Sequence, residues 1–306
     1  MTETVLNNTT NAVFIPTIIA QTALMNFKAY LNLARTVARD SDYTTTTVGT
    51  TIQVPFLGTL EANDKTAGDE YTKQAPTATH VEVTLDQHKE VTVAIDDVTK
   101  VVENQDTLNK YGMEAARALA ETIEDAVASL HPAVENTITW DRSSADTIDS
   151  SMLAIRKYFT DQKVPRNEQR YLYVDSTVFN DLLSVDKYTR VDARGDNPAI
   201  GNGQMIRTYG FDIYESQAVH VSGSPVCYHN LSYTRDAMVI ATRPLPQPSR
   251  ELGGGVSTVV SDPDVGMSLR ANLWYDPKVA AHVFSMDVLY GVAILDQRRL
   301  LEVESV

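Results

Sequence analysis

The chain has 306 residues, of which 43% are hydrophobic and 22% are charged, and this mixture is ordinary for a folded protein of one large or two smaller domains. Its formal net charge of −14 argues against a protein that wraps nucleic acid, because phosphate contacts need clustered Lys and Arg. The single cysteine, Cys227, excludes an internal disulfide and favours a reducing compartment, and we find neither an apolar run long enough to span a bilayer nor a secretory signal.

The N-terminal region, residues 13–38, carries hydrophobic side chains at three- and four-residue steps. This spacing predicts one or two amphipathic helical pieces, and Pro16 suits a first helical turn. A polar loop follows over residues 39–47, and its run of threonines favours extended backbone.

Residues 50–95 contain two strand-like runs separated by a long polar segment. Apolar side chains keep to every second position in both runs, although polar Gln87 and Lys89 interrupt the second, and this indicates one buried and one wet face. They are Ile52, Val54 and Phe56 in the first run, and Val81, Val83, Leu85, Val91, Val93 and Ile95 in the second. Residues 58–80 have almost nothing apolar, and a lone hairpin is only marginally stable in water. The pattern therefore predicts a two-stranded arm that lies on a neighbouring subunit, which favours an assembly protein over an enzyme.

The tip of this arm carries charges of both signs. One interpretation is a solvated loop, and the other is a set of salt bridges to a neighbouring subunit. We favour the second, because a long hairpin needs support from outside and mixed charges fix the register of an interface. The candidate contact residues are Glu61, Asp64, Lys65, Asp69, Glu70 and Lys73.

A long helix is predicted after the arm. Asp106 and Thr107 are good caps, and His131–Pro132 closes the pattern. A helix of about 25 residues spans roughly 38 Å, well beyond the average for globular domains. The apolar positions are Leu108, Tyr111, Ala115, Leu119, Ile123, Val127 and Leu130.

From residue 150 the pattern becomes α/β. We expect helices over residues 152–159 and 176–183, with a buried strand at 170–174 and Asp175 or Ser176 as the cap between them. Residues 204–215 are expected to form a turn that leads into a strand, and further strands are expected at 226–231 and 237–241. A long irregular connection over 243–255 and final strands at 279–295 and 300–303 follow.

Sequence motifs typical of catalysis, phosphate binding or metal binding are sparse. The chain has no Gly-x-Ser-x-Gly elbow and no P-loop. Cys227 with His220 and His229 comes closest to a metal cluster, but a structural zinc site needs four ligands, usually in two closely spaced pairs. We therefore expect no catalytic residue, no cofactor-binding residue and no metal ligand.

Three segments, in this order along the chain, carry a resemblance to the major capsid proteins of tailed bacteriophages, the Hong Kong 97-type fold. They are the strand-cap-helix unit from Arg170 to Leu183, the Gly-Phe strand segment from Gly210 to Ser216, and the Tyr-Gly strand from Leu289 to Val292.

The resemblance implies an α+β fold with an N-terminal arm, an extended β-hairpin loop, a peripheral domain with a long spine helix, and an α/β axial domain. The corresponding divisions are the arm at 1–38, the extended loop and its base strands at 39–100, the spine-helix part of the peripheral domain at 101–145, the axial domain at 146–245, and the connection and return strands of the peripheral domain at 246–306.

The implied function is a major capsid protein that self-assembles through hexamers and pentamers into an icosahedral shell around double-stranded DNA. The implied partners are many copies of the same chain, a portal and decoration proteins. Because the arm begins almost at Met1, we expect a separate scaffolding protein or none. The implied location is the virion, with assembly in the host cytoplasm and no membrane. The alternatives are an encapsulin-like nanocompartment shell that encloses cargo proteins, and an enzyme that uses Asp and His of residues 150–240.

Overall fold

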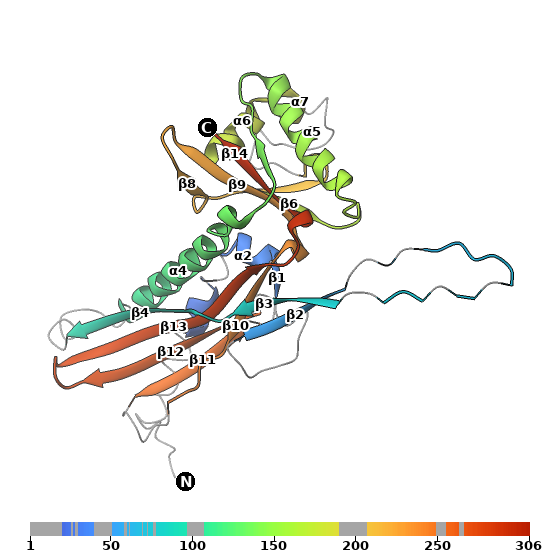
Figure 1. Cartoon of the computed structure of the whole chain (residues 1–306). Helices are drawn as coiled ribbons and strands as arrows, with labels where there is room; N and C mark the ends of the chain where they lie inside the picture. Colours follow the sequence, from blue (N-terminus) through green and yellow to red (C-terminus); the bar gives the residue numbers. More distant parts are fainter. Residues whose placement is uncertain are drawn as a thin grey trace, which may run out of the picture.

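The protein is described here from a computed structural model that covers residues 20–25, 27, 30–39, 51–57, 60, 62–68, 70–71, 73–75, 78–96, 107–189, 207–248, 255–262 and 266–306. Two sheets make up its body, and a two-stranded ribbon continues into a long loop that extends away from them (Figure 1).

The larger sheet is organised around one long strand, β13 (Ala281–Ile294). One edge of β13 pairs antiparallel with β4 (Gln87–Asp96). Its other edge pairs with β12 (Met267–Asp276) in the first half and β10 (Met238–Arg243) in the second. The outer strands of this sheet are β11 (Val256–Asp262), beside β12, and β1 (Ala38–Arg39), beside β10.

The long helix α4 (Thr107–Ala128) lies across one face of this sheet (Figure 1). Because alanines line its buried stripe, α4 packs closely against Phe284, Met286 and Val288 of β13. The short helix α2 (Leu33–Thr36) and the helical residues 20–25 belong to the same core. The expected helical pieces and spine helix are therefore confirmed, while the expected cap Asp106 lies outside the described residues.

The second sheet is mixed and has the order β5-β14-β9-β6-β7, with β8 beside β9. Its strands are β5 (Thr137–Thr139), β14 (Leu300–Ser305), β9 (Cys227–Thr234), β6 (Arg170–Val174), β7 (Phe211–Glu215) and β8 (His220–Ser222). The helices α5 (Ala145–Asp161), α6 (Ser176–Ser184) and α7 (Asp186–Thr189) lie on its outer side (Figure 1).

Both faces of β6 are buried, which explains the apolar run that follows Arg170. Leu172 and Val174 pack with the α5 and α6 core, whereas Tyr171 and Tyr173 join the α4 core. The 3₁₀ turns η3 (Arg235–Ala237) and η4 (Gln297–Arg299) connect strands of the two sheets, and η2 (His131–Ala133) connects α4 to β5.

Helix starts in this region are set by local side chains. Asp175 caps α6 by accepting from the backbone N–H groups of Thr177 and Val178, as expected from the sequence. Helix α5 begins earlier than expected because Ser144 and Thr147 form a reciprocal capping box. Among the described helices, none is long and apolar enough to cross a membrane.

Several sequence-based expectations need correction. The second run of the arm is two strands, because the chain breaks at Leu85–Asp86 and β3 and β4 then pair in different sheets. The last strand, β14, was grouped with the peripheral strands but pairs with β9 and β5 of the second sheet, and β10 joins the larger sheet. Strands β5, β8, β11 and β12 were missed. The alternation of Met267, Leu269, Ala271 and Leu273 would have revealed β12.

Candidate assembly site

The base of the extended loop is a two-stranded sheet of β2 (Thr51–Leu57) and β3 (Ala78–Thr84). The strands are antiparallel, in register from Thr51 opposite Thr84 to Leu57 opposite Ala78. Ile52, Val54 and Val83 point to one face, where they are buried against Val239 and Ala241 of β10. The period-two pattern therefore supplies a core that fastens this ribbon to the larger sheet, on the face opposite α4.

One glycine of β13 lets the ribbon come this close. A Cβ at Gly291 would lie 2.1 Å from the backbone oxygen of Thr84 and 2.9 Å from its carbonyl carbon. No side chain fits in that space. The Tyr-Gly pair at Tyr290–Gly291 thus has a physical role, with Tyr290 buried in the α4 core while the bare backbone of Gly291 faces β3.

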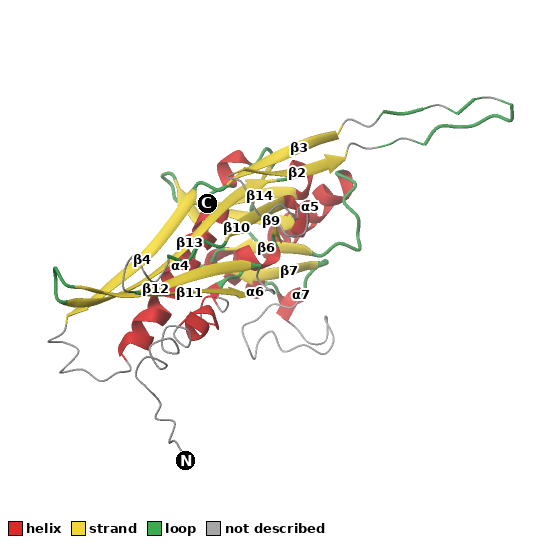
Figure 2. Ribbon diagram, turned by 90° about the horizontal axis from the view of Figure 1, so that it is seen from below, coloured by secondary structure: helices red, strands yellow, loops and turns green. Residues whose placement is uncertain are grey.

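Beyond Leu57 and Ala78 the loop extends away from the rest of the chain, and Figures 1 and 2 show this from two sides. All described residues between 60 and 75 are exposed. Tyr71 is 82% exposed and Leu60 is 65% exposed, although both are large and apolar. Such a segment gains almost no stability from burial against its own chain.

Four of the six charged candidates, Asp64, Lys65, Glu70 and Lys73, are described, and all four are exposed. The Nζ of Lys65 lies 4.8 Å from the centre of the Tyr71 ring and donates to the backbone oxygen of Thr66 at 3.5 Å. Glu61 and Asp69 lie outside the described residues. Their role as contact residues stays a prediction.

A buried carboxylate that sequence reasoning missed fastens the N-terminal segment to α4. Glu124 of α4 is 3% exposed and accepts from the backbone N–H groups of Asn32, Leu33 and Ala34 at 2.8, 2.9 and 2.9 Å. These are the free donors at the start of α2. Burial raises the pKa of Glu124, while the three backbone donors and the Tyr173 hydroxyl oppose that rise.

The sequence offered a signal for this contact. Glu124 follows directly after Ile123 on the apolar stripe of α4, and a charge beside a buried stripe indicates a paired group. Gly291 belongs to the Tyr-Gly strand segment found in the sequence. A glycine is needed there because β3 crosses at this point, and that crossing can be seen only in the structure.

The comparison with protein families agrees with this architecture. The model of a family described as phage capsid protein matches residues 80–242, more than half of the chain. The chain belongs to the phage capsid protein family. This family is structural, so the enzyme alternative finds no support in it. No curated protein sequence matches this phage capsid protein at a significant level.

Solved structures resemble this capsid protein over nearly its whole length. A protein of Mycobacterium phage Che8 shares 18% identity with a TM-score of 0.64, and the match covers 90% of each chain. The capsid structure of cyanophage P-SCSP1u shares 13% identity with a TM-score of 0.62, covering 88% of this chain and 86% of that one.

A virus-like particle from Pyrococcus furiosus matches less well, with 10% identity, a TM-score of 0.50, and coverage of 93% of this chain and 97% of that one. At these identities the likeness shows the fold, which is the α+β Hong Kong 97-type capsid fold. The protein is thus a bacteriophage capsid protein, a structural component of the virion.

Proposed function

We propose that this capsid protein assembles through hexamers and pentamers into an icosahedral shell that encloses double-stranded DNA. The observation that carries the proposal is the extended loop, residues 58–77. Its described residues are exposed and lie away from their own chain. A loop that contacts a neighbour in a head-to-tail manner makes a heterologous interface, and such contacts close into rings.

The charged tip suits this role. The segment 58–77 carries four acidic residues, Glu61, Asp64, Asp69 and Glu70, and two lysines, Lys65 and Lys73. We propose that these side chains form ion pairs with a neighbouring subunit, where they set the register of the loop more than its affinity. Tyr71 and Leu60 supply apolar surface that a neighbour would cover.

The formal charge of −14 fits a shell that encloses DNA without gripping it. We propose a portal, decoration proteins and a separate scaffolding protein as partners, with assembly in the host cytoplasm. The nanocompartment alternative is not favoured, because the family model is that of a phage capsid protein and the phage structures superpose better than the virus-like particle.

The test replaces the loop without disturbing its base. Residues 58–77 are exchanged for Asn-Gly, which suits a two-residue hairpin between the paired Leu57 and Ala78. We expect a folded subunit with nearly unchanged melting temperature, but no closed particles in electron microscopy and no fast-sedimenting species. A control replaces the same segment with a Gly/Ser segment of equal length.

If both variants form complete shells with wild-type yield, the loop is not an assembly element. If the unmodified chain forms closed particles, nuclease-protected DNA in particles from infected cells distinguishes a virus shell from a protein-filled compartment. Wild-type chain that stays monomeric at high concentration with a scaffolding protein present would contradict the shell itself.

A further inference from the structure

We propose that His131, His220 and His229 form a binding site for one divalent transition-metal ion of the zinc type, located where the end of α4 meets the second sheet. The proposal is independent of shell formation, because every ligand comes from the same chain.

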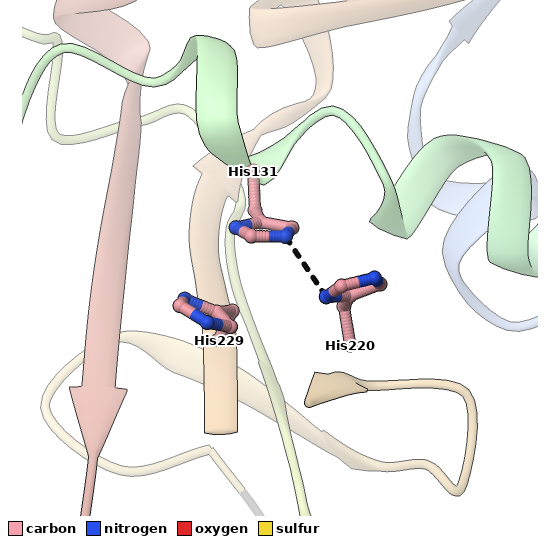
Figure 3. A group of neighbouring side chains, drawn as sticks. All are labelled: His131, His220 and His229. Carbon is pink, nitrogen blue, oxygen red and sulfur yellow. Dashed lines mark hydrogen bonds between the residues drawn. The ribbon is translucent and has the colours of Figure 1, made fainter. Parts of the chain in front are cut away.

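Three separate elements bring these imidazoles together (Figure 3). His131 begins the turn η2 just after α4, His220 begins β8, and His229 lies in β9. One ligand nitrogen from each lies within 4.8 Å of those of the other two. His131 Nε2 and His220 Nδ1 are 3.0 Å apart, and the rings of His131 and His229 stack with centroids 4.0 Å apart.

A buried carboxylate sets the nitrogens of two of these rings. Glu302 Oε1 of β14 accepts from Nδ1 of His229 at 2.6 Å and from Nδ1 of His131 at 3.2 Å. A carboxylate only accepts, so both Nδ1 atoms carry hydrogen and both Nε2 atoms keep a lone pair when the rings are neutral. Metal-bound histidines are commonly oriented in this way by a carboxylate on the other ring nitrogen.

Burial leaves this carboxylate in need of a positive partner. Glu302 is 5% exposed, and its other oxygen accepts only from the Thr137 hydroxyl, at 3.2 Å, among the described residues. An ionised carboxylate inside a protein requires compensation. Three clustered imidazoles beside a buried carboxylate offer the ligand atoms and the negative charge that suit a divalent cation.

Ligand chemistry selects the class of ion. Three imidazole nitrogens favour Zn²⁺, Cu²⁺, Ni²⁺ or Co²⁺ over Mg²⁺ and Ca²⁺, which prefer oxygen. With Zn–N distances of about 2.0–2.1 Å, tetrahedral ligand atoms lie about 3.4 Å apart, so the set closes with small side-chain rotations. Water then fills the fourth position. Ser222, whose hydroxyl contacts His229 Nε2 at 2.6 Å, has to release that nitrogen.

A bound ion would join the turn after α4 to strands β8 and β9. The sequence placed His220 and His229 near each other but gave no sign of His131, which lies 89 residues before His220. A second group, Cys227, His229 and Glu304, shares one ligand with the first and is the competing assignment.

The test titrates the chelator-treated full chain with Zn²⁺ by calorimetry and with Co²⁺ by visible absorption. We expect one ion per chain, a tetrahedral Co²⁺ spectrum, and a melting temperature that rises with Zn²⁺ concentration. His220→Gln, at the half-buried rim, should abolish the Co²⁺ spectrum. Glu302→Gln should weaken Zn²⁺ binding about 10–100-fold, since it removes the orienting carboxylate.

His80→Gln is the matched control, because the His80 side chain is 53% exposed at the loop base and belongs to neither group. It should bind like the unmodified chain, and circular dichroism verifies that each variant is folded. Unchanged binding in folded His220→Gln, or loss of binding in Cys227→Ser alone, would overturn the assignment. Absence of the Co²⁺ spectrum in the unmodified chain would reject the site altogether.

Discussion

Gly291→Ala is the sharpest perturbation of the loop base. The new Cβ would lie 2.1 Å from the Thr84 oxygen and 3.3 Å from Leu85 Cα. Carbon and oxygen tolerate approach to about 3.3 Å, so the β3 backbone has to retreat by about 1 Å. Overpacking of this kind costs about 1–3 kcal/mol.

Complete detachment of the ribbon would cost more. Ile52, Val54, Val83 and Leu85 are buried at the base, and exposing each would cost about 1.5–3 kcal/mol. Overpacking costs less free energy than detachment, so we expect β2 and β3 to shift while staying attached. The shift tilts the base of the loop. Ten extended residues reach about 33 Å, so a small tilt at the base displaces the tip of the loop by a larger distance.

The assay is thermal unfolding of dissociated subunits, followed by assembly. At about 2–4 °C per kcal/mol for a chain of this size, we expect a melting temperature lower by roughly 2–12 °C and a reduced yield of closed shells. Thr84→Ala is the control, because its side chain is exposed and its carbonyl is retained. A Gly291→Ala protein that melts within 1 °C of the parent and assembles normally would refute the reasoning.

Two further predictions concern polar contacts. Glu124→Gln removes the charged group that accepts hydrogen bonds from the backbone N–H groups of residues 32–34. We expect the free energy of unfolding in urea to fall by about 1–3 kcal/mol and the N-terminal segment to be cleaved faster by protease. Unchanged values of both would contradict this role. Burial raises the pKa of Asp149, but hydrogen bonds from Lys187, Tyr188 and Tyr209 outweigh it and hold that pKa below its ordinary value. Because the folded-state pKa is depressed, this stabilisation is present above about pH 4 and is lost as the pH falls further. The urea midpoint should therefore drop less between pH 5 and pH 3 in Asp149→Asn than in the parent, and parallel pH profiles would sink the idea.

Local patterns determined many elements. The three- and four-residue spacing gave α4, and an unbroken apolar run gave β6, because each signal arises within one segment. Asp175 could be named as a cap since its partners are the next two or three residues. The polar content of residues 58–80 was enough to predict a projecting loop, because a segment without apolar side chains cannot build a core.

Pairing partners could not be predicted in this way. Apolar residues between 81 and 95 keep one parity, with Gln87 and Lys89 as exceptions. The chain nevertheless divides at Asp86 between two sheets, since pairing depends on strands about 30 and 200 residues away. For the same reason, the sequence did not predict that β14 lies in the second sheet, between β5 and β9.

The loop base, the Glu124 contact and the histidine cluster also depend partly on local sequence and partly on tertiary structure. Sequence alone determined which side chains could be buried, capped or exposed, because hydrophobic period and charge are local properties. Only the tertiary structure decided that Glu124 meets α2, that Gly291 faces Thr84, and that His131, His220 and His229 surround one point. Those contacts join segments far apart in the chain, and the packing of the whole fold sets the distances between them.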